Sequence, residues 1–360
     1  MQLNVLVLPG DGIGAEVTHE AVKVLHRVGG KFGHALHLTE GLLGGVAIHK
    51  TGQPLPEETA RLAQDADATL LGAVGLPEFD NAPPAQRPER GLLGIRKILG
   101  VYANLRPVRT YAALIDSSPL KNERVAGTDM IIVRELTGGI YYGTPRGISG
   151  SGDAERAVNT MAYTRAEIAR IGRMAFHLAG NRRKKVASVD KSNVLECSQL
   201  WRRVMVEVAA DFPGIELEHV LVDNCAMQLV LNPTRFDVIV TENMFGDILS
   251  DEGAVLAGSI GMLPSASLGE RRPSGAYTGL YEPVHGSAPD IAGQNKANPL
   301  GAIGSVAAML EYSFGLLEEA AAVNRAIEHV LNSGRVTADL KPKGAPATTT
   351  QVGDSVCEAL

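Results

Sequence analysis

The chain has 360 residues, a formal net charge of -6 at pH 7 and a pI near 5.9. This length predicts two domains or one large α/β unit, and the acidic balance does not favour nucleic acid or an anionic membrane as a partner. No apolar run approaches the roughly 18 residues that a membrane span requires. The 3 cysteines lie far apart and cannot form a disulfide framework, so we expect a reducing, cytoplasmic environment.

Segments typical of strands and of helices alternate along the chain, and this order predicts an α/β fold. The N-terminus is typical of a buried strand rather than a signal peptide. We expect strands at 5–8, 68–74, 103–108, 129–135, 185–189, 217–222 and 237–241. Apolar residues at helical spacing predict helices at 15–28, 91–99, 165–179, 194–210, 300–312 and 318–331, with a last helix after a polar turn at 348–350. The predicted domains are 1–101 with 258–360, and 102–257.

A glycine-rich turn follows the first predicted strand and opens the first predicted helix. Gly10, Gly12 and Ala15 match the dinucleotide-binding pattern G-x-G-x-x-A, and Glu40 follows at a distance. Asp11 lies inside the turn, where its charge would repel a pyrophosphate. The turn is therefore either a nucleotide loop or a structural turn that contacts a ligand only through its backbone.

A second loop, at 282–293, is the most informative stretch of the sequence. Pro283 and Pro289 exclude a helix, and Gly286 and Gly293 weaken a strand, so a binding loop is predicted. Asp290 beside a nucleotide would accept hydrogen bonds from ribose hydroxyls and repel a 2′-phosphate. The alternative is an ordinary surface turn.

Carboxylates with the spacing of a metal site occur in the second half of the chain. Asp247 and Asp251 are four residues apart and share a helix face, and Asp223 ends another strand. Three carboxylates without a matching His or Cys cluster suit Mg²⁺ or Mn²⁺. The alternative is that the helical pair caps the helix or faces solvent.

Three arginines and a Tyr–Lys pair are the other candidate functional groups. Arg96, Arg106 and Arg134 follow apolar runs, and converging guanidinium groups would bind carboxylates in a bidentate manner. Tyr141 and Lys191 stand at predicted strand ends, where a tyrosine can act as an acid and a lysine of lowered pKa as a base. The alternatives are structural ion pairs, a core tyrosine and a surface lysine.

Three segments together, 8–14, 134–141 and 245–251, resemble the β-hydroxyacid oxidative decarboxylases, the isocitrate/isopropylmalate dehydrogenase family. The resemblance extends over nearly the whole chain. It implies that family's own two-domain α/β fold, not a Rossmann fold, so the opening glycine match would not be the cofactor site. Residues 1–101 and 258–360 would bind the cofactor, and residues 102–257 would carry the dimer interface and the metal and catalytic residues.

The resemblance also implies an activity, namely NAD-dependent oxidative decarboxylation of a substituted malate. Lys191 would be the base and Tyr141 the acid, and the three arginines would bind the substrate carboxylates. Asp247 and Asp251 would hold Mg²⁺ or Mn²⁺. Asp223, which would also contact substrate, and Lys191 would come from the partner subunit of a homodimer with shared active sites.

Further residues follow from the same resemblance. The residues that face the cofactor would be Ile13, Glu282, His285, Gly286, Ser287, Ala288, Asp290, Ile291 and Asn298. The residues that face the substrate substituent would be Glu89, Leu92, Leu93, Asn193 and Val194. The leucine pair favours an isopropyl group and hence isopropylmalate, the substrate of leucine biosynthesis.

Two residues leave the specificity open. Arg90 stands where isocitrate enzymes carry a serine, so D-malate, tartrate, homoisocitrate and isocitrate remain alternative substrates. Lys296 is a cation near the expected adenosine site and would weaken the bias against NADP. A non-catalytic regulatory subunit is a further alternative, but it would require the loss of catalytic groups that this chain retains.

Overall fold

The computed structural model describes residues 1–360, apart from the side chain of Ala85, and the chain forms two compact units. Unit 1 contains residues 1–101, 111–119 and 257–360, and unit 2 contains residues 102–110 and 120–256. The predicted boundaries differ from these units at 111–119 and at residue 257. The segment 111–119 belongs to unit 1, where the Ser117 hydroxyl donates to the Leu340 carbonyl oxygen at 3.1 Å.

Unit 1 contains a five-stranded portion of sheet in the order β2-β1-β3-β12-β11. All neighbours are parallel except β11, which pairs antiparallel with β12. The sequence did not predict β2, β11 or β12. The strands are β1 (Gln2–Gly10), β2 (Ala35–Glu40), β3 (Ala68–Ala73), β11 (Pro264–Arg271) and β12 (Tyr277–Pro283).

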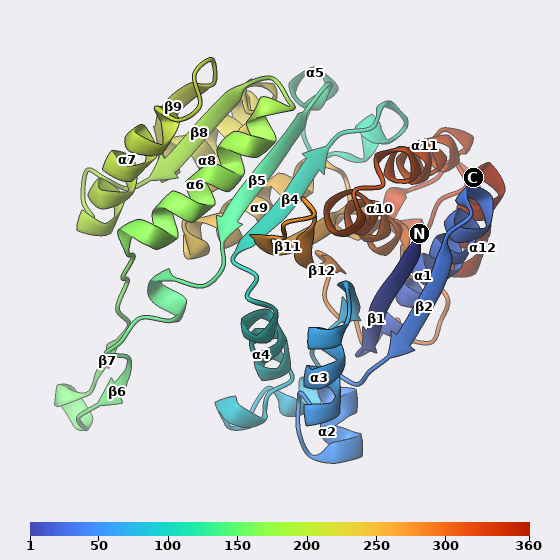
Figure 1. Cartoon of the computed structure of the whole chain (residues 1–360), viewed down its shortest axis with the longest axis horizontal. Coiled ribbons are helices and arrows are strands. Elements are labelled where there is room, and N and C mark those ends of the chain that lie inside the picture. Colours follow the sequence, from blue (N-terminus) through green and yellow to red (C-terminus); the bar gives the residue numbers. More distant parts are fainter. The chain divides into compact units, whose positions relative to one another are not determined.

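Helices pack on the strands of unit 1. Helices α1 and α10 contact β3, whereas α4 contacts β12 and α3 packs against α4. The C-terminal helices α11 and α12 lie next to α10 and α1 (Figure 1). The helices are α1 (Gly14–Phe32), α2 (Gly45–Thr51), α3 (Glu57–Asp65), α4 (Glu89–Leu99), α10 (Leu300–Phe314), α11 (Leu317–Ser333) and α12 (Thr349–Ala359).

One apolar cluster of unit 1 fixes α3 and α4 on the sheet. Leu6 and Leu8 of β1 point to the same face because side chains alternate along a strand. They are completely buried with Leu71, Leu280 and Ile95. Burying each such side chain stabilises the fold by roughly 1.5–3 kcal/mol. Helix α4, which begins with Glu89, is thereby held on the sheet.

Unit 2 contains the strand order β4-β5-β10-β8-β9, antiparallel between β4 and β5 and parallel elsewhere. Helices α6 and α7 lie in front of these strands in Figure 1, and α8 and α9 lie behind them. The strands are β4 (Ala103–Arg109), β5 (Asp129–Glu135), β8 (Lys185–Asp190), β9 (Glu216–Leu221) and β10 (Val238–Thr241). The helices are α5 (Asn122–Val125), α6 (Arg165–Gly180), α7 (Glu196–Ala209), α8 (Val222–Leu231) and α9 (Asn243–Leu256).

Buried β-branched residues explain why β10 is an interior strand. Val238, Ile239 and Val240 are 0% exposed, as expected for a parallel strand covered on both faces. Helix α6 begins at a capping box, in which Thr164 and Glu167 satisfy each other's backbone N–H groups. The apolar side of α7 buries Trp201, whose Nε1 donates to the Ser188 hydroxyl at 3.2 Å.

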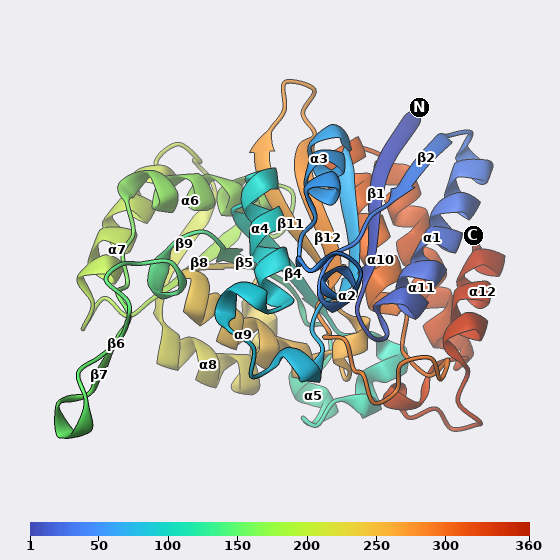
Figure 2. The same cartoon turned by 90° about the horizontal axis from the view of Figure 1, so that it is seen from below.

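A two-stranded hairpin that the sequence did not predict projects from unit 2. It consists of β6 (Gly147–Ser149) and β7 (Arg156–Val158), paired antiparallel. Both views show it extending away from the rest of the unit (Figures 1 and 2). Ile148 is 73% exposed, so the hairpin contributes nothing to the core of one chain.

No helix among the described residues combines the length and the hydropathy that crossing a bilayer requires.

A histidine on edge strand β9 makes stability depend on pH. Both ring nitrogens of His219 are buried without a hydrogen-bond partner among the described residues. Burial, and then the charge of Arg202, lowers the pKa of His219. The folded state therefore binds this proton less readily than the unfolded state, so stability is lost as pH falls through the unfolded value of about 6.5.

We expect His219→Phe to reduce the loss of unfolding free energy between pH 8 and pH 5, measured by urea denaturation. His37→Phe, at an exposed position on edge strand β2, is the matched control and should keep the wild-type pH dependence. If His219→Phe loses as much unfolding free energy between pH 8 and pH 5 as the wild type, His219 does not have this role.

Candidate active site

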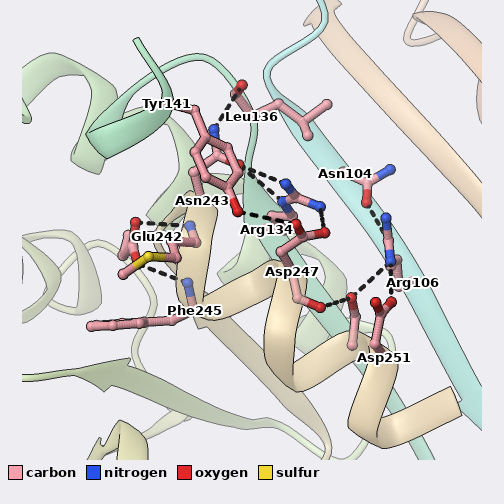
Figure 3. Close-up of polar contacts among 12 residues, drawn as sticks. Asn104, Arg106, Arg134, Leu136, Tyr141, Glu242, Asn243, Phe245, Asp247 and Asp251 are labelled. Carbon is pink, nitrogen blue, oxygen red and sulfur yellow. Dashed lines mark hydrogen bonds and ion pairs between the residues drawn. The ribbon is translucent and has the colours of Figure 1, made fainter. Parts of the chain in front are cut away.

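A polar cluster forms in unit 2 where β5 and β10 end and α9 begins (Figure 3). Asp247 accepts a hydrogen bond from the Tyr141 hydroxyl at 3.1 Å, and its other oxygen pairs with Nη1 of Arg134. Nη1 of Arg106 donates to Oδ1 of Asp251 at 3.2 Å. The structure therefore brings together five of the residues that the sequence predicted: Arg106, Arg134, Tyr141, Asp247 and Asp251.

The guanidinium of Arg134 is the buried centre of this cluster. Arg134 is 6% exposed and lies on β5, which pairs with β10. Its Nε and Nη2 donate to Oδ1 of Asn243 at 3.0 Å and 2.9 Å. A Cβ at Gly246 would lie 2.6 Å from Cγ of Arg134, so only glycine leaves room for the arginine. The buried charge is thus paired and hydrogen-bonded, as its burial requires.

The phenol of Tyr141 is placed to act as a proton donor. Burial, followed by the nearby Asp247 carboxylate, raises the pKa of Tyr141. A phenol with a raised pKa stays protonated at neutral pH. Tyr141 is nevertheless 40% exposed, so a ligand can reach its hydroxyl.

Lys191 and Asp223 form a pair of their own in unit 2. The Lys191 ammonium lies 2.6 Å from Oδ1 of Asp223, and the Asp223 side chain is 60% exposed. Lys191 follows β8. The expectation that Asp223 ends a strand is corrected, because β9 ends at Leu221 and Asp223 lies in the first turn of α8. The hydrogen bond from Lys191 lowers the pKa of Asp223. An ionised, exposed carboxylate next to an ammonium can meet groups from outside the chain.

The aspartates on α9 fit an oxygen-preferring divalent cation. Asp247 and Asp251 lie one helical turn apart, and their side chains are 37% and 64% exposed. Carboxylates of this kind are ligands that Mg²⁺ and Mn²⁺ prefer. Across the described residues no group of three or more His, Cys, Asp or Glu could hold a metal ion. The cluster thus brings together two of the three predicted carboxylates, whereas Asp223 pairs with Lys191 elsewhere in unit 2.

In unit 1, Arg96 is paired with a residue that was predicted to face the cofactor. Nη2 of Arg96 donates to Oε1 of Glu282 at 2.8 Å, and both side chains are largely buried. Nε of Arg96 is buried and has no acceptor among the described residues. Glu282 and Pro283 belong to β12, so the expectation that the loop begins at 282 is corrected. The antiparallel partner β11 supplies the pairing that keeps this stretch extended.

The loop that follows β12 packs on the opening turn of unit 1. The Ile13 amide donates to the Ser287 carbonyl oxygen at 2.8 Å. A Cβ at Gly12 would lie 2.0 Å from that oxygen, so Gly12, with φ of 55°, is required for the approach. Ala288 adopts a left-handed φ of 36°. The two loops that the sequence singled out are therefore adjacent.

The remaining residues predicted to face the cofactor differ in their accessibility. Burial lowers the pKa of His285, whose Nδ1 lies 2.9 Å from the carbonyl oxygen of Gly286. Asp290 is exposed, and Ile291 is partly buried. Asn298 is 6% exposed and uses its amide within unit 1, donating to Asp339 at 3.0 Å.

Asp11 explains why the opening glycines are not a phosphate-binding loop. Its carboxylate is 2% exposed and accepts hydrogen bonds from the amides of Gly45, Val46 and Gly75, each at 2.8 Å. A phosphate-binding turn needs free backbone donors and no fixed anion. Here the anion is part of the protein, and it ties three segments of unit 1 together.

The residues expected to face the substrate substituent lie in both units. On α4, Glu89 and Arg90 are exposed, and Leu93 is 37% exposed. Leu92 packs partly buried against the apolar cluster around Ile95. The other two follow Lys191 in unit 2: Asn193 is exposed and Val194 is 62% exposed.

Sequence reasoning missed three residues that support the cluster. Glu242 directly precedes α9, Asn243 is its first residue, and the Tyr163 hydroxyl donates to Glu242 at 3.3 Å. Glu242 is 4% exposed, and burial raises its pKa, although the amides of Phe245 and Met244 oppose the shift. The available signal was two polar residues directly after the apolar run of β10.

The two-unit α/β fold carries an Arg–Asp–Tyr cluster at strand ends, and this set of groups is suited to an enzyme that acts on a carboxylate substrate. A family model described as isocitrate/isopropylmalate dehydrogenase matches residues 4–356, and the chain belongs to this family. It is 60% identical over 347 residues to the 3-isopropylmalate dehydrogenase of Geobacillus kaustophilus, covering 96% of this chain and 92% of the relative. It is 56% identical over 361 residues to that of Halalkalibacterium halodurans, covering 100% and 98%.

A solved structure of the same class agrees in fold. The isocitrate dehydrogenase from Methylococcus capsulatus superimposes with a TM-score of 0.85 at 33% identity, over 99% of each chain. The family's two-domain fold, rather than a Rossmann fold, is thereby confirmed. Members of this family use NAD and Mg²⁺ or Mn²⁺.

Proposed function

We propose that this chain catalyses the NAD-dependent oxidative decarboxylation of (2R,3S)-3-isopropylmalate to 4-methyl-2-oxopentanoate, a step of leucine biosynthesis. The observation that carries the proposal is the contact of Asp247 with both Arg134 and Tyr141. This contact brings together the guanidinium of Arg134, the carboxylate of Asp247 and the phenol of Tyr141. The high identity to named 3-isopropylmalate dehydrogenases supports the choice of substrate.

The residues divide the chemistry between them. Arg96, Arg106 and Arg134 bind the carboxylates of the malate. Lys191, as the neutral amine, would take the proton of the C2 hydroxyl as C2 is oxidised, and Tyr141 would protonate C3 after CO₂ has left. Asp223, Asp247 and Asp251 would hold Mg²⁺ or Mn²⁺, which would supply Lewis-acid stabilisation of developing negative charge.

A substrate panel tests the proposal. The purified chain, supplied with Mn²⁺, is assayed with isopropylmalate, isocitrate, homoisocitrate, D-malate and tartrate, each with NAD and with NADP. We expect the highest kcat/KM for isopropylmalate with NAD, because Leu92 and Leu93 offer apolar contact to an isopropyl group. One methylene in such a pocket changes selectivity by roughly 10–200-fold, so slow turnover of D-malate is compatible. A higher kcat/KM for isocitrate or homoisocitrate would overturn the assignment and implicate Arg90.

We infer that Asp290 selects NAD over NADP. The supporting observations are its exposure and its position in a loop that packs on the opening turn. We expect Asp290→Lys to raise the ratio of kcat/KM for NADP to that for NAD by about tenfold or more, because hydrogen bonds to charged groups are worth about 1.5–3 kcal/mol. Lys296→Ala should change this ratio less, because the Lys296 ammonium donates to Gln294 at 2.7 Å.

Asp65→Lys provides a matched control for Asp290→Lys. It makes the same charge change at an exposed position of unit 1, at the end of α3. The control should leave the cofactor ratio at the wild-type value. If Asp290→Lys leaves the ratio of kcat/KM for NADP to that for NAD at the wild-type value, Asp290 does not select the cofactor.

We infer a homodimer with shared active sites, in which Lys191 and Asp223 serve the partner's metal and substrate. The support is an exposed apolar surface on α8 and α9, two helices that contact each other. Met227 is 56% exposed and Ile248 is 60% exposed. Exposed apolar patches of this kind mark interfaces, and a two-fold axis would place the same patch on both sides.

The free cysteines Cys197, Cys225 and Cys357 support a cytoplasmic location.

A further inference from the structure

The first residue of α9 uses every polar atom of its side chain (Figure 3). Asn243 is 1% exposed. Its Oδ1 accepts from Nε and Nη2 of Arg134, and its Nδ2 donates to the carbonyl oxygens of Leu136 at 3.1 Å and Gly138 at 3.2 Å. A carboxamide has two lone pairs and two N–H bonds to offer. All four are satisfied, so the amide has one orientation.

One side of this amide fixes Arg134. A guanidinium is planar, so holding Nε and Nη2 sets the direction of Nη1 as well. Nη1 points to Asp247, the residue that also accepts from Tyr141. Without Asn243 the edge formed by Nε and Nη2 would lose this acceptor, and these two hydrogen bonds would no longer set the direction of the guanidinium.

The other side fixes the backbone that leads to Tyr141. Leu136 and Gly138 follow β5 and precede the turn of 3-10 helix Gly139–Tyr141. The carbonyl groups of both residues are held by the same nitrogen that belongs to Asn243. The positions of Arg134 and of the Tyr141 segment are therefore coupled through one side chain.

Asn243 is itself held rigidly. Its backbone amide donates to the Tyr163 hydroxyl at 3.0 Å. The preceding Glu242 caps α9 by accepting from the amides of Met244 at 3.0 Å and Phe245 at 2.7 Å. Hydrogen bonds that hold a supporting residue in place keep the functional group that it contacts within about 0.5 Å of its working position.

We propose that Asn243 is a positioning residue for this reaction, which orients Arg134 toward a substrate carboxylate and sets the Tyr141 segment beside Asp247. The proposal rests on the function given above and assigns no direct contact with substrate to Asn243. It gives Asn243 a role distinct from that of Glu242, because Glu242 caps α9 and the Asn243 side chain makes no capping bond.

The test is a double-mutant cycle with separate measurement of KM and kcat. Asn243→Ala should raise KM for isopropylmalate by about 10–100-fold, because it releases the two bonds that orient Arg134. KM for NAD should stay within about twofold, since the loop expected to bind NAD belongs to unit 1. In an Arg134→Ala background the same change at Asn243 should raise KM by less than about threefold, because a positioning residue has no effect once the group that it orients is absent.

A purely structural role predicts a different pattern. Partial unfolding lowers the active fraction and hence kcat, but leaves KM unchanged. Ser188→Ala, which removes the acceptor of the buried Trp201 bond in the same unit, is the control for a lost buried hydrogen bond and should leave both KM values unchanged. Asn243→Ser keeps a small hydrogen-bonding group and gives the same comparison if Asn243→Ala does not fold. Its KM for isopropylmalate should lie between the values for Asn243→Ala and the wild type.

The outcomes separate the two proposals. A wild-type chain that turns over no malate derivative contradicts the function itself. An active wild type in which the effects of Arg134→Ala and Asn243→Ala on KM simply multiply contradicts the positioning role and leaves the function intact. Loss of the KM effect in the Arg134→Ala background supports both.

Discussion

Lys191→Met should lower kcat for isopropylmalate by about 10²–10⁴-fold, the usual contribution of general base catalysis. Methionine keeps the length and removes the amine, so the Asp223 pair is lost but little volume changes. KM for NAD should be unaffected. Lys185→Met is the matched control, because Lys185 forms an exposed pair with Glu216 at 3.1 Å in the same unit. Exposed pairs of this kind contribute about 0–1 kcal/mol, so the control should keep wild-type kcat.

The same variant tests whether active sites are shared. If Lys191 serves the partner, mixing Lys191→Met with Asp247→Asn lets subunits exchange, and each mixed dimer has one intact site and one doubly altered site. Random exchange should restore about a quarter of wild-type activity, because half of the dimers are mixed and a two-fold dimer has two equivalent sites. No recovery, after exchange has been verified by mass spectrometry, would place Lys191 and Asp247 in the same chain's site. A pH–rate profile of Lys191→Met identical to wild type would remove Lys191 as the base.

Asp11→Ala should destabilise the chain by about 3–5 kcal/mol, because one buried and two part-buried backbone N–H groups lose their acceptor. A buried N–H left unsatisfied costs about 1–3 kcal/mol, and a part-buried one is expected at the lower end of that range. Asp11 is 2% exposed, and its partners lie in two segments, one at Gly45 and Val46 and the other at Gly75. The free energy of unfolding in urea measures the effect. Asp11→Asn keeps one oxygen acceptor and should fall between alanine and wild type. A loss of less than about 1 kcal/mol for Asp11→Ala would show that water replaces the carboxylate.

The sequence was most informative where burial is two-sided. Strands such as β10 are continuous apolar runs, and their existence follows from composition alone. The segment β2 escaped prediction because it is an edge strand with polar residues such as His37 and Thr39. The hairpin of β11 and β12 was missed for a similar reason, since serine, glycine and arginine interrupt β11. Strand β2 and the β11–β12 hairpin depend on pairing with a neighbour, which local composition does not record, whereas the edge strand β9 alternates polar and apolar residues and was predicted.

The candidate site was predictable as a set of residues and not as an arrangement. The spacing of Asp247 and Asp251 already placed them on one helix face. The contact of Arg134 with Asn243 could not be foreseen, because it depends on β5 lying next to β10 in the sheet. The role of Asp11 depends on a contact with Gly75, far along the chain. Such contacts depend on the order of the strands in the folded chain. The sequence motifs identify the residues that take part but not which of them are in contact.

The close approach of Gly12 to the Ser287 carbonyl oxygen has a consequence for protein engineering. Two segments far apart in the sequence pack backbone against backbone here, so a change of backbone path in one affects the other. A grafted cofactor loop that displaces Ser287 loses its bond from the Ile13 amide. Redesign of nucleotide preference is therefore safest at side chains that face away from the opening turn, with the carbonyl at 287 left in place and glycine retained at 12.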